Sequence, residues 1–364
     1  MRQSHTIQKS NAVIVPQIAI SDRRFFAELP KKGLIAYNRN NMASPSSPSR
    51  LPSGTRAVVI YNPRSGTHDI QASLAGALEV FHEQGWQIDV QRTQQAGDVE
   101  RYSAEARLAG YDAVLTAGGD GSLNEAANAL AHSEVALGTL PSGTANVWAR
   151  QIGLPIPAPL YAAHMADAAR ALCAGLVRPI DLGRTNERYF LLWSGAGLDA
   201  YVTSKIEPRP PWVKRWGVMG YGLRAAWHAV QYRGTPMTIE IDDQLAWRGR
   251  TLMVLISNIQ LYAGIVRPSP EAHVDDGWLD VCIFQGASFA YTARHFISIA
   301  LGQAAQNPQL INTRGRHIRI TAKPPTAVHV DAEPMGVTPV EVKIQPGALR
   351  VIVPQTAPAA LFSN

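Results

Sequence analysis

The stretch from Asp112 to Leu130, DAVLTAGGDGSLNEAANAL, is an apolar run that ends in Gly-Gly-Asp-Gly and restarts at once with helical spacing. Gly118, Gly119 and Gly121 supply backbone freedom at a sharp turn, and their missing side chains let a ligand approach the main chain. The N–H groups at the start of the following helix favour an anion such as phosphate. The Asp120 carboxylate would repel that phosphate unless a divalent cation or a transferring proton lay between them. The pattern predicts a phosphate-binding turn, and the alternative is an ordinary Gly-rich turn with Asp120 as a helix cap.

Strand-like and helical segments alternate regularly from Thr55 onward. The runs RAVVIYNPRSG, WQIDVQRT, YDAVLTAGG and VALGTLPSG are β-rich, and segments with helical spacing separate them. This alternation predicts a parallel sheet covered by helices, with ligands at the carboxyl ends of the strands. A polar or Gly-rich turn follows each of these strands: Asn62 to Gly66, Thr93, Gly118 to Asn124, and Pro141 to Asn146. We expect these turns to converge and to form a nucleotide site.

The periodicity changes after a helical segment at 158–176. The short β-rich runs that follow predict a second, mostly β domain. The expected organisation is a disordered basic extension at 1–54, an α/β nucleotide-binding domain at 55–178, a β-rich domain at 179–356 and a tail at 357–364. A stretch at 204–234 interleaves basic residues with tryptophans, which suits an anionic membrane surface. The alternative for that stretch is a solvated helical hairpin packed on the β domain.

Composition and charge exclude several classes of protein. No apolar run in the 364 residues approaches the ~18 needed to cross a bilayer, so we expect a soluble or peripheral protein. Cys173 and Cys282 lie in apolar contexts, which argues against a disulfide framework and fits the cytoplasm. Residues 1–56 hold nine Lys or Arg against two Asp or Glu, so the net charge of +6 belongs to the extension. The nearly neutral remainder gives no support for nucleic-acid binding.

An ordered set of motifs resembles the diacylglycerol kinase catalytic-domain family, which includes bacterial lipid kinases and the sphingosine and ceramide kinases. The likeness runs from about Arg56 to about Pro354. The motifs are Asn62-Pro-x-Ser-Gly66, Gly118-Gly-Asp-Gly-Ser-x-Asn-Glu125, Gly138-x-x-Pro-x-Gly-Thr-x-Asn146, Gly195-x-Gly-x-Asp199, SPEAHVDDGWLD and VDAE. The resemblance implies an ATP-dependent, Mg²⁺-dependent lipid kinase. It also implies a nucleotide domain, a β-sandwich lipid domain and an active site in the cleft between them.

The resemblance assigns roles to individual residues. The implied nucleotide-binding positions are Asn62, Pro63, Ser65, Gly66, Thr93, Gly118, Gly119, Asp120, Gly121, Ser122, Asn124, Glu125, Gly143, Thr144 and Asn146. Asp120 would act near the phosphates and Mg²⁺, and Asp199 would lie near the lipid head group. A structural Mg²⁺ would bind the Asp276 carboxylate and the main-chain carbonyls of His273 and Trp278. The alternative for Asp275 and Asp276 is a simple β-turn, since Asp-Asp-Gly is a common hairpin signal.

The segment VHVDAE holds the candidate catalytic carboxylates. Asp331 and Glu333 lie two residues apart on an expected strand, so both would project from the same face. Such a pair can split its roles, with one group ionised near a metal and the other accepting a proton. The resemblance makes Glu333 the proton acceptor for a lipid hydroxyl that attacks the γ-phosphoryl group of ATP. We expect this lipid to be met at a membrane surface.

The sequence departs from the family pattern at three points. Ala332 replaces the usual glycine of Asp-Gly-Glu and is tolerable if its φ is negative. Ser122 replaces a threonine and keeps the hydroxyl group. Val147 and Trp148 replace an Asp-aromatic pair, and the lost carboxylate could weaken a loop that contacts nucleotide or lipid.

Two other functions remain open from the sequence. An NAD kinase would share the glycine turn and the alternating domain, and an assay that offers NAD separates it from a lipid kinase. A non-catalytic lipid- or nucleotide-binding protein is the alternative suggested by Ala332 and Val147. It would bind ATP without turnover.

Overall fold

The computed structural model describes residues 48–63, 65, 70–158, 161–206, 227–229, 231–303 and 306–363. Most of the basic, tryptophan-rich stretch at 204–234 and most of the N-terminal extension lie outside these residues. None of the helices in the described ranges is long and apolar enough to cross a membrane.

The N-terminal part is the predicted parallel sheet. Its strands are β1 (Arg56–Tyr61), β2 (Gln87–Arg92), β3 (Ala113–Gly118) and β4 (Ala136–Pro141). They pair in parallel in the order β2-β1-β3-β4. The chain moves outward from β1 to β2 and then returns past β1 to β3, so the strand order reverses between β1 and β3. In such sheets a ligand binds at the carboxyl ends of the strands beside this reversal.

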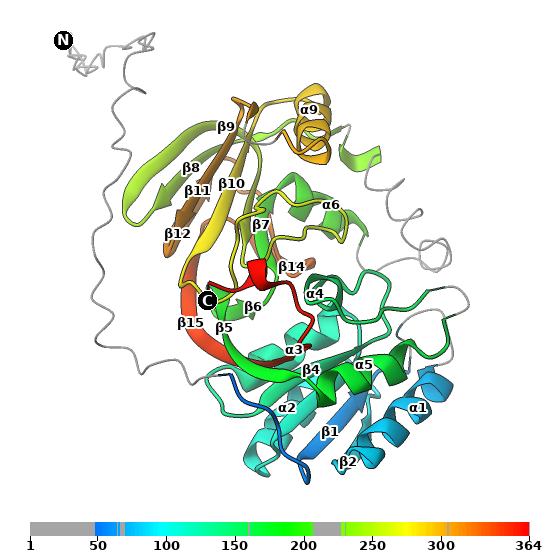
Figure 1. Ribbon diagram of the computed structural model, residues 1–364. Coiled ribbons are helices and arrows are strands. Elements are labelled where there is room, and N and C mark those ends of the chain that lie inside the picture. The colour runs from blue at the N-terminus through cyan, green and yellow to red at the C-terminus, as the bar shows by residue number, and fades with distance from the viewer. Residues whose placement is uncertain are drawn as a thin grey trace, which may run out of the picture. The chain divides into compact units, whose positions relative to one another are not determined.

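Helices cover both faces of this sheet (Figure 1). They are α1 (Ile70–Glu83), α2 (Asp98–Leu108), α3 (Asp120–Leu130), the short α4 (Val147–Gln151) and α5 (His164–Cys173). α1 packs beside α5, and α2 packs beside α3. Helix α1 buries Ile70, Leu74, Ala77 and Phe81, whose spacing of three and four residues forms one apolar stripe.

The C-terminal part is rich in β-strands. These are β5 (Leu176–Thr185), β6 (Arg188–Phe190), β7 (Trp193–Gly197), β8 (Thr235–Ile241), β9 (Gln244–Ser257), β10 (Leu279–Gln285), β11 (Leu310–Gly315), β12 (His317–Ala322), β13 (Ala327–Val330), β14 (Glu333–Val337) and β15 (Val340–Val353). The helical elements here are α6 (Leu198–Ile206), α9 (Phe289–Ala300) and the 3₁₀ helix η3 (Ala359–Leu361). The predicted fold class, α/β followed by mostly β, is confirmed.

One strand joins the two parts. The long β15 pairs with β5 and β12 in the β-rich part, and its last residues pair in parallel with β4. The expected boundary at residue 178 therefore falls inside β5 rather than in a linker. Sequence periodicity could not show this, because β5 and β15 read as ordinary strands.

The two ends of the described chain pack on the folded body. Ser49 and Val177 form a β-bridge through their main-chain N–H and C=O groups, although residues up to 54 were expected in the disordered extension. At the other end, Leu361 is fully buried, and the Ala360 carbonyl accepts a hydrogen bond from the Gln260 side chain. The expected tail therefore contributes to the core, because its apolar residues find a place to be buried.

The segment VHVDAE is a tight hairpin rather than one continuous strand. β13 and β14 pair as neighbours from Val330 and Glu333 outward, so Asp331 and Ala332 form the two-residue turn. Their φ values are 45° and 64°, as a type I′ turn requires. The expectation that Asp331 and Glu333 share one strand face is wrong. The φ of Ala332 is positive, so the condition under which alanine was expected to be tolerable at this position is not met. Strand alternation cannot apply to residues that make a turn.

The left-handed conformation at position 332 destabilises the fold when the residue is alanine, because its Cβ is crowded there. Glycine adopts this conformation without that cost. Because a glycine at this position also carries a backbone-entropy cost, we expect Ala332→Gly to raise the free energy of unfolding by about 0.5–1 kcal/mol. Urea denaturation of the two proteins measures this difference. The control is Ala174→Gly, at an exposed position with φ −79°, which should bring no gain. A loss of stability in Ala332→Gly would contradict the assignment of strain to this turn.

Candidate active site

The predicted turns meet at the carboxyl ends of the parallel strands. The Asn62 N–H donates to the Ala117 carbonyl (3.2 Å), and the Ser142 N–H donates to the Gly118 carbonyl (3.0 Å). The hydroxyl groups of Ser65 and Ser142 lie 3.1 Å apart. Thr93 follows β2 at the same edge, with its N–H bonded to the Tyr61 carbonyl. The expected convergence is confirmed for these residues, while Gly66 lies outside the described part of the chain.

The glycines of the turn are needed for close approach. A Cβ on Gly143 would lie 2.6 Å from the Cα of Gly119, so the two loops touch backbone to backbone. A Cβ on Gly118 would lie 2.7 Å from the Ser122 hydroxyl oxygen. None of Gly118, Gly119 and Gly121 has a positive φ, so the backbone freedom expected of them is not used. Their value is the exposed main chain that they leave between two loops.

Asp120 holds the start of α4. Its two carboxylate oxygens accept hydrogen bonds from the N–H groups of Val147 (3.0 Å) and Trp148 (3.2 Å). Asp120 therefore caps a neighbouring helix rather than its own. Burial raises the pKa of Asp120 against the opposing effect of these amides. The Val147 side chain is 3% exposed and belongs to the core, so an apolar residue suits this position.

Asn146 closes the second loop upon itself. Its side-chain amide donates to the Gly143 carbonyl (2.7 Å) and accepts from the Gly143 N–H (2.9 Å). The residue is buried and has a φ of 48°. Thr144 is exposed at the tip of the loop. Of the two polar residues, Thr144 is thus the one free to face a ligand.

Asp331 lies at the centre of a buried hydrogen-bond network. Its carboxylate accepts from the main-chain N–H groups of Leu191 (2.9 Å), Leu192 (3.0 Å) and Trp193 (2.9 Å). The Asn124 side chain on α3 donates a fourth bond of 2.6 Å. Burial raises the pKa of Asp331 to about 6, although the three main-chain amides act in the opposite direction. The network fixes the β13–β14 turn against α3.

A second set of bonds fixes β6 on the same helix. The Tyr189 N–H donates to the Asn128 side chain (3.0 Å), and the Tyr189 carbonyl accepts from Asn124 (3.1 Å) and Asn128 (3.0 Å). Asn124 therefore binds both the turn and β6. It thus links the two parts of the molecule, and its contact with nucleotide stays a prediction.

Glu333 follows the turn and lies directly at the glycine segment. Its Oε1 is 3.3 Å from the position that a Cβ on Gly121 would take. Its Oε2 forms an ion pair with Arg188, whose Nη2 also donates to Asn124 Oδ1 at 3.3 Å. The Glu333 side chain is 41% exposed, so a substrate can reach it.

A cavity of about 550 Å³ opens beside Glu333. Its walls come from the start of α2, one side of α3, the β5–β6 turn and β14: Gly97, Glu100, Glu125, Asn128, Asn186, Glu187, Arg188, Glu333 and Met335. Burial, and then the charge of Glu333, raise the pKa of Glu125. The loop that leads into α2 is held by Asp98, which accepts the N–H groups of Gln94 and Gln95.

Asp199 lies at the start of α6 beside an imidazole. Its Oδ2 is 2.7 Å from Nε2 of His329, a residue of β13 that is completely buried. The ring fits because Gly195 has no side chain, since a Cβ there would lie 2.5 Å from Nε2. Burial alone would raise the pKa of Asp199, but the neighbouring His329 and Tyr262 offset this and bring it below its usual value.

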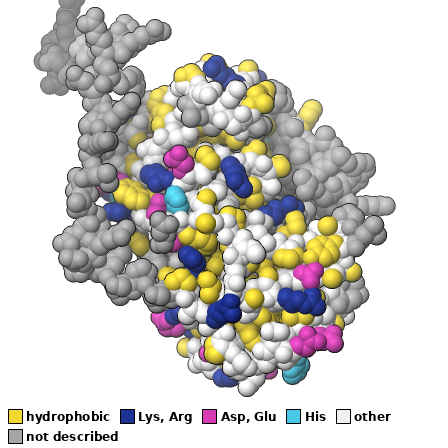
Figure 2. Space-filling model, in the orientation of Figure 1, with side chains coloured by type: hydrophobic (Ala, Val, Ile, Leu, Met, Phe, Trp, Pro, Cys, Tyr) yellow, Lys and Arg dark blue, Asp and Glu magenta, His cyan; other side chains and the backbone are white. Residues whose placement is uncertain are grey.

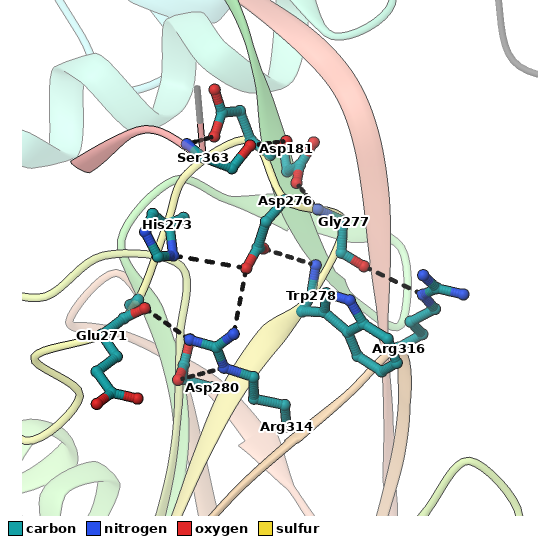
Figure 3. A network of polar contacts seen from close by, with 12 residues as sticks. Asp181, Glu271, His273, Asp276, Gly277, Trp278, Asp280, Arg314, Arg316 and Ser363 are labelled. Carbon is teal, nitrogen blue, oxygen red and sulfur yellow. Dashed lines mark hydrogen bonds and ion pairs between the residues drawn. The ribbon is translucent and has the colours of Figure 1, made fainter. Parts of the chain in front are cut away.

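The Asp-Asp-Gly turn is closed by an arginine (Figure 3). The Asp276 carboxylate faces Nη1 of Arg314 (3.5 Å) and Nδ1 of His273 (3.7 Å), and it accepts the Trp278 N–H (3.0 Å). Arg314 also binds Asp280 (3.2 Å) and the Glu271 carbonyl (2.6 Å).

The charges at this turn combine several carboxylates with one guanidinium. Burial, and then the charges of Asp276 and Asp275, raise the pKa of Asp181, while Arg314 pairs with Asp276 and Asp280. The implied Mg²⁺ site, with one carboxylate and two main-chain carbonyls, stays a prediction.

Three residues of these sites escape sequence reasoning. Arg188, Arg314 and His329 meet carboxylates that are distant in the sequence, and an isolated Arg or His in a strand gives no local signal. Only the pairing of strands reveals their partners.

Comparison with known proteins identifies the family. Residues 56–185 match the model of the diacylglycerol kinase catalytic domain, and residues 194–353 match that of the YegS C-terminal NAD kinase beta sandwich-like domain. Diacylglycerol kinase of Bacillus subtilis is 29% identical over 288 residues, which cover 79% of this chain and 92% of the relative. The chain belongs to the diacylglycerol kinase catalytic-domain family and is a lipid kinase by class.

Other relatives agree with this assignment. A diacylglycerol kinase of Staphylococcus epidermidis is 27% identical over 286 residues, covering 78% of this chain and 87% of the relative. A crystal structure of a diacylglycerol kinase from Bacillus anthracis superposes with a TM-score of 0.62 at 22% identity, over 83% of this chain and 98% of that one. The latter likeness concerns the fold.

If Arg314 closes the Asp-Asp-Gly turn, chelation should leave the stability of the protein unchanged. We expect the same Tm in excess EDTA and in excess Mg²⁺. Arg314→Gln should lower the free energy of unfolding by about 1–3 kcal/mol, because two largely buried carboxylates lose their partner. It should also make Tm dependent on Mg²⁺, since a cation can then enter.

The matched control for Arg314 is Arg319→Gln on β12, whose acidic partners are exposed. It should change neither stability nor metal response appreciably. A wild-type protein that loses stability in EDTA, with Arg319→Gln behaving alike, would contradict closure by Arg314 and support a bound Mg²⁺.

Proposed function

We propose that this protein transfers the γ-phosphoryl group of ATP to the hydroxyl group of a lipid of the diacylglycerol type. One observation carries the proposal. The Glu333 carboxylate, a group able to accept a proton, lies against Gly121 of the turn that the sequence marks for phosphates. These residues are 212 positions apart in the sequence, and their closeness in the fold supports the proposal of a base beside the phosphates.

Glu333 is the proposed proton acceptor. It takes the proton of the lipid hydroxyl group while the lipid oxygen attacks the γ-phosphorus, and ADP leaves from the opposite side. The main-chain N–H groups at the glycine turn and at the start of α3 stabilise the charge that develops on the phosphate. Mg²⁺, which is expected to accompany ATP, supplies further charge neutralisation when it is bound.

Asp331 is proposed to position this base. Four N–H donors occupy its carboxylate, which leaves it poorly placed to accept a proton from a lipid. Because it fixes the turn just before Glu333, its contribution is geometric. Asp120 is likewise proposed to hold the two phosphate-facing loops together through α4.

Asp199 is proposed to orient the acceptor lipid. Its depressed pKa keeps the carboxylate ionised, and an ionised carboxylate accepts a hydrogen bond from a lipid hydroxyl group. His329 holds it from the buried side at 2.7 Å.

Peripheral contact with a membrane is proposed through the outer face of α9. Ile297 on this helix and Leu301, which directly follows its last residue, are 59% and 64% exposed, and they share a face with the exposed Arg294. The opposite face buries Thr292 and Ile299. Figure 2 shows hydrophobic atoms together with Lys or Arg atoms at the end of the molecule where Figure 1 places α9.

The charged residues around α9 are suited to a surface of anionic lipid. The sequence from Val281 to Val330 contains no Asp or Glu, while exposed Arg250 lies beside the turn before α9, where its carbonyl accepts the Gly286 N–H. An apolar helix face with cations and without carboxylates suits the surface of an anionic bilayer.

The proposed reaction predicts a labelled lipid. With γ-labelled ATP, we expect transfer to at least one lipid in a panel of diacylglycerol, monoacylglycerol, phosphatidylglycerol, sphingosine and ceramide. Glu333→Gln should reduce the rate about 10²- to 10⁴-fold because the general base is lost, while ATP still binds. The control is Glu187→Gln, on the same cavity wall and 91% exposed, which should retain activity.

Each outcome of this assay separates the candidate functions. Label on NAD in place of lipid would support an NAD kinase, and ATP binding without any transfer would support a binding protein. Full activity of Glu333→Gln would reject Glu333 as the base.

Membrane contact through α9 predicts selective binding to vesicles. The protein should sediment with phosphatidylglycerol vesicles more than with phosphatidylcholine vesicles. Replacing both Ile297 and Leu301 by Gln should weaken binding about ten- to hundredfold, because two apolar side chains no longer enter the bilayer. Leu108→Gln, at an 87% exposed position on α2, is the control. Equal sedimentation of the double variant and wild type would remove α9 from the membrane surface.

A further inference from the structure

Arg188 is held in place by its neighbours before any ligand arrives. It is the first residue of β6, and the next residue, Tyr189, is bonded through its N–H and C=O groups to Asn124 and Asn128 of α3. The backbone that carries the guanidinium is therefore fixed relative to the helix that begins at the glycine turn. A donor fixed in this way loses little entropy when it binds a ligand.

The guanidinium retains donors for a ligand. Its Nη2 serves both Glu333 and Asn124, whereas no hydrogen bond from Nη1 or Nε is found within the described part of the chain. The side chain is 34% exposed and lines the 550 Å³ cavity. An arginine carries five N–H donors in a planar fork that matches the oxygens of a phosphate.

The walls of the cavity need a positive charge if a phosphate is to enter. Glu100, Glu125, Glu187 and Glu333 line it, and Arg188 is the only Lys or Arg among the described lining residues. Without a cation, the carboxylates that line the cavity would repel a nucleotide phosphate. Glu333 lies beside Gly121 through one carboxylate oxygen and pairs with Arg188 through the other, so Arg188 is also close to the glycine turn.

We propose that Arg188 binds the γ-phosphoryl group of the nucleotide and exchanges its ion pair with Glu333 for the phosphate oxygens. This inference rests on the proposed function and assigns to that site a catalytic residue. The lipid O–H bond breaks and its proton passes to Glu333, while the lipid oxygen forms a bond to phosphorus. The bond from phosphorus to the bridging oxygen breaks, and its electron pair leaves with ADP. Neutral Glu333 then no longer attracts Arg188, whose charge stays with the phosphoryl oxygens.

The test compares a nucleotide that has a γ-phosphate with one that lacks it. Isothermal titration gives the Kd of the β,γ-imido analogue of ATP and of ADP, with Mg²⁺ and without any lipid. Arg188→Gln should weaken the analogue about ten- to hundredfold and leave ADP within about twofold, as expected for the loss of one charged contact. Arg188→Lys should restore part of the loss because it restores the charge.

Two further variants sharpen the comparison. Glu333→Gln should bind the analogue at least as tightly as wild type, because Arg188 no longer has a competing carboxylate. Arg184→Gln is the matched control. Arg184 is also 34% exposed and pairs with Glu187 on the same hairpin, and its loss should change neither Kd.

The inference would be overturned if the ratio of the two Kd values in Arg188→Gln were the same as in wild type. It would also be overturned if Arg188→Gln and Arg188→Lys each weakened the binding of the analogue and of ADP by the same factor. Retained ADP binding shows that a variant is folded. Because no lipid is present, the result is independent of the acceptor. A failed lipid panel together with a selective loss of the analogue would reject the proposed acceptor and keep the role of Arg188.

Discussion

The carboxylate of Asp331 is the interaction on which the candidate active site depends. It is buried, and its four N–H donors come from the two residues between β6 and β7, from the first residue of β7 and from α3. A buried charge is stable only when such donors satisfy it, so the network holds together or fails as a unit. The turn that it fixes carries Glu333, and the helix that it fixes begins at the glycine turn. One side chain thus sets the distance between the proposed proton acceptor and the expected phosphate site.

Sequence reasoning was accurate where chemistry is local. The alternation of strands and helices predicted the parallel sheet, and the turns after β1, β3 and β4 meet as expected. Gly119 and Gly143 show why their glycine signal was strong, because any side chain at Gly143 would collide with the facing loop. The reason given for the glycines was only half right, since it is close approach rather than a positive φ that requires them.

The errors arose where partners are distant in the sequence. A strand reading of VHVDAE put Asp331 and Glu333 on one face, whereas a hairpin turn separates a buried structural carboxylate from an accessible one. Arg314 gave no local signal of the carboxylates that it would meet. Such pairings depend on strand register, which a single sequence does not display. Arg188 is the clearest case, since it lies 145 positions from Glu333.

The shared strand β15 limits how the site can exclude water. Its pairing with β5 and with β4 joins the two parts through sheet hydrogen bonds, and the bond between Asn124 and Asp331 adds a second link across the site. A hinge between the two parts would have to bend β15 or break these bonds. Large closure of one part upon the other is therefore disfavoured, whereas many kinases use such closure to keep water from the phosphate. The acceptor itself is then the better candidate to displace water, because a bulky apolar lipid seated near Glu333 occupies the place from which a water molecule would attack.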